Sequence, residues 1–202
     1  MTELTISGFN FTELLRKRLP IYHKAGGGKI TLLDTPQQYH LPVTLELLRV
    51  LTTEFDSSGV YMTTMKVYSE LVPILDAHEV DVSKIYFVDV VSKMYGLEPE
   101  RTPRCEFVSS PINIQSIKNA VSGYLDKLTS QRRFVVFDSL TTILLYNSLP
   151  RIVQFTTDIA EHLKAQHVDA ILVMMTTAKG STNDKLIAEL KPILDDRIDI
   201  PD

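Results

Sequence analysis

The sequence has very little cysteine, no surplus of basic residues and no long apolar run. Its single cysteine, Cys105, excludes an internal disulfide and fits a reducing compartment. The formal net charge of −4 gives no electrostatic footprint for nucleic acid or for an anionic membrane. No apolar run approaches the length of a membrane span, and the first residues lack the basic and apolar regions of a signal peptide. We therefore expect a cytoplasmic protein that contacts neither nucleic acid nor membrane.

A metal-binding pattern is also missing. The five histidines are scattered along the chain. His162 and His167 are five residues apart, which does not match the i, i+4 spacing of a helical metal site. No cysteine accompanies them and their own spacing does not fit, so we expect no metal.

The chain has 202 residues, of which 44% are hydrophobic, and this is enough for one sizeable core. We expect a single domain over residues 1–202, with its core at about 29–200 and an N-terminal helix and turn over 1–28. In that first part, Asn10 and Glu13 have the spacing of a capping box for a helix that reaches Arg18.

Apolar strand patterns alternate with amphipathic helical patterns along the rest of the chain. We expect strands at residues 30–33, 59–64, 84–89, 133–138, 170–175 and 197–200. Between them, helices are expected at residues 42–55, at 69–79, after a Ser110-Pro111 cap, from Ser148, and at 182–194. This order predicts an α/β fold, with a mostly parallel sheet covered by helices on both faces in three layers, α/β/α.

The most informative stretch is the apolar run at residues 134–137, which leads directly into Asp138 and Ser139. A continuous apolar run is typical of a strand buried on both faces of a parallel sheet. Open α/β sheets place their ligand sites where such strands end. In P-loop ATPases this is the Walker B position, whose aspartate helps to hold Mg²⁺.

The phosphate loop that should accompany such an aspartate is missing. A phosphate cradle needs glycines, which let backbone N–H groups close on the phosphate, and a lysine that reaches the β- and γ-phosphates. No glycine occurs in residues 30–58, and after Lys29 the next lysine is Lys66. The glycine run at 26–28 precedes the first strand instead of following it, so we interpret it as a turn into that strand.

On these strands the chain resembles the RecA/KaiC-like ATPase core, especially the short KaiC-like proteins of archaea. The resemblance covers about residues 31–200. It rests on residues 134–141, which match the family's Walker B strand, and on 59–63, 82–89 and 168–174, which match neighbouring strands. It implies a RecA-like P-loop NTPase-type sheet. Members of the family often assemble into hexameric rings with nucleotide at the interfaces.

Two catalytic elements of that family have no counterpart in the sequence. The Walker A glycines and lysine would fall between Asp34 and Val43, where none is present. The family's catalytic glutamate, which activates water, follows the second strand, where this chain has Thr63-Thr64-Met65-Lys66. The resemblance thus implies a degenerate Walker A and a fold retained after hydrolysis was abandoned, so we expect no catalytic residue.

We therefore expect a protein that acts by interaction or regulation, through a protein partner or self-association. The alternative is an unconventional nucleotide or small-ligand binder that uses the crevice at the carboxyl ends of the strands. An active ATPase with unfamiliar residues is the third hypothesis. No motif supports a cofactor, although ATP with Mg²⁺ stays open. The candidate ligand contacts are Thr35, Gln37, Gln38, Tyr39, His40, Asp138 and Ser139.

Asp138 has two interpretations. As a structural residue it would accept hydrogen bonds from nearby groups such as Ser139 or Thr35. As a functional residue it would contact Mg²⁺ or a ligand. Without a phosphate loop, we favour the structural interpretation.

Overall fold

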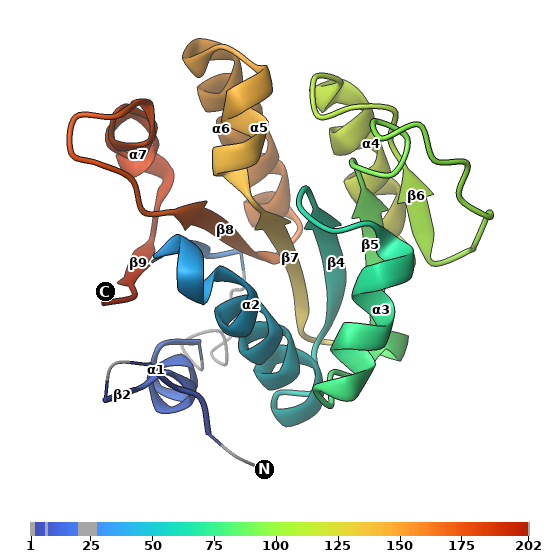
Figure 1. Ribbon diagram of the computed structural model, residues 1–202, viewed down its shortest axis with the longest axis horizontal. Helices are drawn as coiled ribbons and strands as arrows, with labels where there is room; N and C mark the ends of the chain where they lie inside the picture. The colour runs from blue at the N-terminus through green and yellow to red at the C-terminus, as the bar shows by residue number, and fades with distance from the viewer. Residues whose placement is uncertain (1–2, 7, 20–27, 202) are drawn as a thin grey trace.

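A seven-stranded parallel sheet organises the fold (Figure 1). The computed structural model describes residues 3–6, 8–19 and 28–201. In it the strand order is β6-β5-β4-β7-β8-β3-β9, and every neighbouring pair is parallel. The strands are β3 (Ile30–Thr35), β4 (Ser58–Thr63), β5 (Ile85–Asp89), β6 (Cys105–Phe107), β7 (Arg133–Asp138), β8 (Asp169–Met175) and β9 (Asp196–Asp199).

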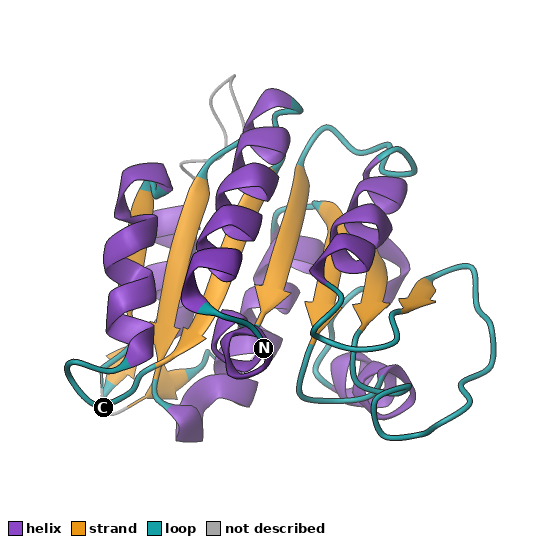
Figure 2. Ribbon diagram, turned by 90° about the horizontal axis from the view of Figure 1, so that it is seen from above, coloured by secondary structure: helices purple, strands orange, loops and turns teal. Residues whose placement is uncertain are grey.

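Helices cover both faces of this sheet, each over its own apolar core (Figure 2). One face carries α1 (Phe11–Arg18), α2 (His40–Arg49) and α3 (Tyr68–Ala77). The other face carries α4 (Ile114–Leu125), α5 (Leu140–Tyr146), α6 (Leu149–Ala165) and α7 (Thr182–Leu190). The predicted three-layer α/β/α class with a parallel sheet is confirmed.

Short elements complete the chain. Strands β1 (Thr5–Ile6) and β2 (Phe9–Asn10) form an antiparallel pair before α1. Helix α2 continues into a π-helix at Val50–Glu54, and single 3₁₀ turns occur at Gln37–Tyr39, Val82–Lys84 and Lys191–Ile193. In the part of the chain that the structure describes, no helix combines the length and apolar character needed to cross a membrane.

The alternation of side chains in β7 explains how one strand serves both cores. Val135 and Phe137 belong to the core under α4–α7, whereas Phe134 and Val136 belong to the core under α1–α3. Successive side chains of a strand point to opposite faces. Asp138 is therefore in phase with Phe134 and Val136, and its side chain is directed towards the α2 layer.

Several local predictions are wrong. The short strand β6 was not expected, because its three residues follow a loop rich in Pro, Gly and charge. Helix α5 was not expected either, since a helix of seven residues shows little periodicity. Helix α4 begins after Asn113, whose side chain accepts from the N–H of Ser116, and not after Ser110.

Two other helix boundaries differ from the prediction. Helix α3 covers Tyr68–Ala77 and not the predicted residues 69–79, and Ser69, where the helix was expected to begin, lies inside it together with Pro73. Helix α7 stops at Leu190, because Pro192 in the following 3₁₀ turn has no N–H to continue the helix. By contrast, Asn10 caps α1 as predicted by accepting from the N–H of Glu13. The predicted turn at residues 26–28 lies mostly outside the described residues.

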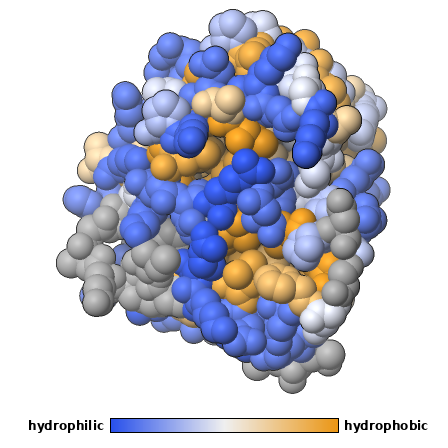
Figure 3. All heavy atoms as spheres, turned by 90° about the vertical axis from the view of Figure 1, so that its left-hand side faces the viewer, coloured by the Kyte–Doolittle hydropathy of each residue, from blue (hydrophilic) through white to orange (hydrophobic). Residues whose placement is uncertain are grey.

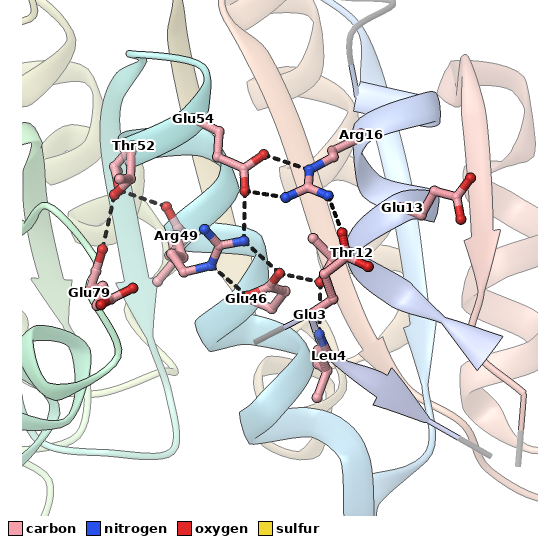
Figure 4. A network of polar contacts seen from close by, with 12 residues as sticks. Glu3, Leu4, Thr12, Glu13, Arg16, Glu46, Arg49, Thr52, Glu54 and Glu79 are labelled. Atoms are coloured by element: carbon pink, nitrogen blue, oxygen red, sulfur yellow. Dashed lines mark hydrogen bonds and ion pairs between the residues drawn. The ribbon is translucent and has the colours of Figure 1, made fainter. Parts of the chain in front are cut away.

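A partly buried ion-pair network joins α1 to α2 and the π-helix (Figure 4). The guanidinium of Arg16 donates two hydrogen bonds, of 2.8 and 2.9 Å, to the carboxylate of Glu54. Arg49 donates to the same carboxylate and to Glu46, which also accepts from the hydroxyl of Thr12. The arginines neutralise the acidic residues, and the hydrogen bond from Arg16 is the main cause of the lowered pKa of Glu54.

The β9 edge of the sheet carries charges that pair with one another. Arg197 bonds to Asp34 at 3.1 Å and to Asp199 at 2.6 Å, and Arg18 of α1 reaches Asp196. The space-filling view from this side is largely hydrophilic, with separate apolar areas between the polar ones (Figure 3). Charged side chains of this kind discourage a further strand from pairing with an exposed edge.

Gly59 offers a direct test of how closely β4 and β7 pack. A Cβ on Gly59 would lie 2.4 Å from the carbonyl oxygen of Phe134, whereas a Cβ on Gly123 in α4 would meet nothing within 4 Å. We expect Gly59→Ala to lower the free energy of unfolding by about 1–3 kcal/mol. The matched Gly123→Ala should raise it by up to about 1 kcal/mol, because alanine favours a helix. Urea unfolding of both variants measures this, and an unchanged Gly59→Ala protein would contradict the packing described.

Candidate functional site

The carboxyl edge of the sheet brings Asp138 against one residue of α2 and one of β4. Asp138 ends β7, His40 begins α2 and Tyr61 lies inside β4. The Nε2 atom of His40 is 2.5 Å from Oδ1 of Asp138, and the hydroxyl of Tyr61 donates to Oδ2. All three residues are buried, with 3% of Asp138, 6% of His40 and 2% of Tyr61 exposed. Both carboxylate oxygens are therefore engaged inside the protein.

The strand register explains this meeting. Tyr61 lies opposite Val136, and Thr63 lies opposite Asp138, in the β4–β7 pair. Tyr61 belongs to the core under α1–α3, the face towards which Asp138 is directed. The 3₁₀ turn at Gln37–Tyr39 then places His40, at the start of α2, over the end of β7.

The charge of Asp138 changes the acid–base behaviour of both partners. Burial disfavours the imidazolium form of His40, but the hydrogen bond and the charge of Asp138 outweigh it, so the pKa of His40 is raised. For Tyr61, burial is the main cause and the charge of Asp138 adds to it, so the pKa of the phenol lies well above its usual value. Tyr61 is thus a hydrogen-bond donor at physiological pH.

The expected partners of Asp138 were wrong. The hydroxyl of Thr35 is directed to the carbonyl of Pro36 at 3.4 Å. Ser139 caps α5, because its hydroxyl oxygen accepts from the N–H of Thr142 at 3.3 Å. Ser139 and Asp138, which are joined by a cis peptide bond, contact Thr64 through their backbone: the N–H of Ser139 donates to the hydroxyl of Thr64 at 2.8 Å, and the N–H of Thr64 donates to the carbonyl of Asp138 at 2.7 Å.

Of the other candidates, the structure brings His40 alone to the carboxylate. Gln37 and Gln38 are exposed, and Tyr39 is half-buried. Tyr61 was not among the predicted site residues, because in the sequence it is one residue of an apolar strand. Tyr61 lies two residues before Thr63, the residue of β4 that is opposite Asp138. Its position can be known only from the pairing of β4 with β7.

Two further aspartates at this edge also have internal partners. Asp89, which ends β5, accepts from the N–H groups of Tyr68, Val91 and Ser92 and from the Ser92 hydroxyl. Asp34 of β3 accepts from Thr176 at 2.9 Å as well as from Arg197, and burial raises its pKa.

Among the described residues, no three His, Cys, Asp or Glu side chains are grouped so that they could hold a metal ion.

The larger pockets lie away from Asp138. One of about 520 Å³ lies between β6 and α4, and one of about 510 Å³ lies beside the N-terminal segment and α2. A third, of about 500 Å³, lies between the start of α3 and residues 97–102. Asp138 is not part of the lining of any of these three.

The comparisons with known proteins give a family and a fold. A family model described as a family of unknown function (DUF7090) matches residues 42–202. No curated protein matches the sequence. Among solved structures, the uncharacterized protein PH0321 from Pyrococcus horikoshii, in complex with an unknown peptide, is similar with a TM-score of 0.63 and 12% identity, over 93% of this chain and 82% of that one.

The KaiC-like protein PH0186 from the hyperthermophilic archaeon Pyrococcus horikoshii OT3 is similar with a TM-score of 0.56 and 15% identity, over 79% of this chain and 68% of that one. At these identities the likeness concerns the fold. It confirms the RecA/KaiC-like fold that the strand motifs predicted.

Truncation of the buried carboxylate should destabilise the protein. In Asp138→Ala, His40 and Tyr61 lose their shared acceptor inside the core, and we expect the free energy of unfolding to fall by about 1–3 kcal/mol. Asp138→Asn keeps an oxygen for Tyr61 and should cost less. Urea unfolding of both variants provides the measurement. An Asp138→Ala protein as stable as the parent would show that the carboxylate is not a structural anchor.

The contact between His40 and Asp138 should also make stability depend on pH. The native state holds the His40 proton more tightly than the unfolded state, whose histidine has a pKa of about 6.5. The stabilisation is therefore complete below about pH 6.5 and is lost as the pH rises through the higher native pKa. We expect the stability difference between the parent and His40→Gln to shrink over that range in urea unfolding. A difference that is constant with pH would contradict the raised pKa.

Proposed function

The chain belongs to the family of unknown function DUF7090, and we propose that it acts by protein–protein interaction or regulation, through a partner protein or copies of itself, and not by ATP hydrolysis. The observation that carries the proposal is the engagement of both Asp138 oxygens by His40 and Tyr61. In a P-loop ATPase the corresponding aspartate helps to hold Mg²⁺ and so has to be available to it. Here a buried imidazole and a buried phenol occupy the carboxylate.

The segment between β3 and α2 supports the same proposal. A phosphate loop wraps its glycine backbone around the phosphates ahead of this helix. In this chain, a glycine-free 3₁₀ turn at Gln37–Tyr39 fills that place, and His40 at the helix start is directed to Asp138. The sequence of this loop is therefore best explained as a degenerate Walker A.

The position after β4 supports it as well. The hydroxyl of Thr63 donates to the carbonyl of Lys66 at 2.7 Å, and that of Thr64 accepts from the N–H of Ser139. Both side chains stabilise the turn, and neither offers a carboxylate that could orient an attacking water.

A partner-binding role is compatible with one of the structural neighbours. The uncharacterized protein PH0321 was crystallised in complex with an unknown peptide. That peptide belongs to PH0321, but it indicates that a protein of this fold can present a surface to a polypeptide.

We expect neither nucleotide binding nor ATP hydrolysis. A ligand that binds only the native state raises the midpoint of thermal unfolding by mass action. Saturating Mg-ATP, Mg-ADP or Mg-GTP should therefore leave the midpoint of the parent unchanged, and purified protein should release no phosphate from ATP. Sedimentation velocity over a range of concentrations would show whether the protein associates with itself.

Asp138→Asn serves as the control in the same assay. If the parent shifts with a nucleotide and Asp138→Asn does not, the crevice at the carboxyl ends of the strands is a ligand site, and the alternative function replaces the one proposed. Phosphate release by the parent that is lost in Asp138→Asn would establish an ATPase.

A further inference from the structure

The segments at the carboxyl edge of the sheet expose apolar side chains. Over residues 3–6, 8–19 and 28–201, the exposed large apolar side chains all lie in segments that follow strands β4 to β7: Met65, Tyr95, Leu97, Ile112, Leu145 and Tyr146. Leu145 is the most exposed of them, at 77%. Single apolar residues are common on protein surfaces, so the informative question is which of these side chains lie together.

The end of α5 is tied to the turn before α4. Nδ2 of Asn147 donates to the carbonyl of Pro111 at 3.0 Å. Asn147 directly follows the exposed pair Leu145 and Tyr146, and Pro111 directly precedes the exposed Ile112. The hydrogen bond therefore brings these three apolar residues to one surface, which we call the α5 surface.

Helix α5 is apolar on its outer side as well as on its inner side. Leu140, Ile143 and Leu144 belong to the core under α4–α7, whereas Leu145 and Tyr146 are exposed. The helix lies beyond the tip of β7 (Figure 1). A surface helix normally turns polar residues away from the core, and a helix that is apolar all round is typical of a buried one. The composition of α5 thus indicates a cover on its outer side.

The two segments that form the α5 surface carry no charge. Residues 107–117 and 139–150 contain no Asp, Glu, Lys, Arg or His, although 23% of the chain is Asp, Glu, Lys or Arg. Their exposed polar residues are Ser109, Asn113, Gln115 and Ser148. Hydroxyl and carboxamide groups both donate and accept hydrogen bonds, so an identical surface can satisfy them. A rim with charges of one sign would instead repel its own copy.

The net charge of the chain favours contact at the same surface. At a formal net charge of −4, two copies repel each other, and the repulsion is smallest where neither copy presents a charge. In a twofold dimer both copies use the same patch, which has to be complementary to itself. The interfaces of homodimers are also more apolar than the rest of the surface.

The edges of the sheet are less suited to a second copy. At β9, charged side chains pair with one another. At β6, Thr102 forms an antiparallel bridge with Cys105, and Nζ of Lys93 binds the carbonyl of Phe107 at 2.5 Å. Few backbone groups remain there for pairing with another chain. Association through a face of the molecule is therefore favoured over association through a sheet edge.

We propose that a second copy of this chain covers the α5 surface in a dimer with twofold symmetry. Leu145 and Tyr146 form the apolar centre of the contact together with Ile112, and the uncharged polar residues form its rim. This inference rests on the proposed function and specifies the partner as a copy of the chain.

Sedimentation velocity over a series of concentrations tests the proposal. We expect the parent to change from monomer to dimer as its concentration rises. Leu145→Lys places a charge in the apolar centre of the contact and should weaken dimerisation by about tenfold or more. Lysine suits the last turn of a helix, so this variant should stay folded.

Two matched variants serve as controls. Leu145→Met keeps an apolar side chain and should dimerise. Gln131→Lys adds the same charge as Leu145→Lys, but at an exposed position before β7, at the amino edge of the sheet, and should also dimerise. Thermal unfolding midpoints show that each variant is folded.

Photocrosslinking locates the contact. The photoreactive amino acid p-benzoyl-L-phenylalanine replaces Tyr146, and this protein is mixed with heavy-isotope-labelled parent before irradiation. Mass spectrometry identifies the peptides that join a light chain to a heavy one. We expect the heavy peptides to come from residues 107–117 or 139–150.

Three results would overturn the inference: a parent that is monomeric throughout, a Leu145→Lys protein that dimerises as tightly as the parent, or crosslinks to other parts of the chain. In each case an unchanged unfolding midpoint with Mg-ATP would leave the proposed function standing, with another partner or another surface. Conversely, a dimer of the expected kind whose midpoint rises with Mg-ATP would overturn the proposed function and leave the α5 contact in place.

Discussion

The structure depends on a buried carboxylate at the end of its central strand. Strand β7 is buried on both faces and finishes at Asp138, whose side chain is directed towards the α2 layer. An isolated carboxylate in such a place is costly unless hydrogen bonds or an opposite charge compensate it. His40 and Tyr61 supply the hydrogen bonds, and His40 adds the opposite charge when it is protonated. The compensation ties the start of α2 to the ends of β7 and β4, so the loop before α2 is fixed by the same contact that satisfies the aspartate.

The same solution recurs along the carboxyl edge of the sheet. Asp89 collects backbone donors from the turn after β5, and Asp34 binds Thr176 and Arg197 from two other segments. In open α/β sheets this edge is where ligands usually bind. In this chain its acidic groups hold neighbouring loops in place.

The sequence indicated two members of the central cluster but not how they meet. Asp138 was found because a polar residue follows an apolar strand, and His40 was included because it precedes a helix at the same edge. Thr35 and Ser139 were expected to bond to Asp138 because they are near it in sequence or at the same strand ends. Their hydroxyls instead serve the local backbone, at Pro36 and at the cap of α5. Tyr61 could not be chosen, since nothing in an apolar strand reveals which neighbour lies opposite.

The sequence by itself determined six strands of the seven-stranded sheet, most of the helices and the parallel α/β class, because these follow from the period of apolar residues and from local caps such as Asn10. Tertiary structure alone decided the remainder. Strand β6 exists because β5 offers it an edge, and α5 exists because Ser139 caps it where β7 ends. The partners of Asp138 follow from strand order and register. Those are set by long-range pairing, which leaves no periodic signal along the chain.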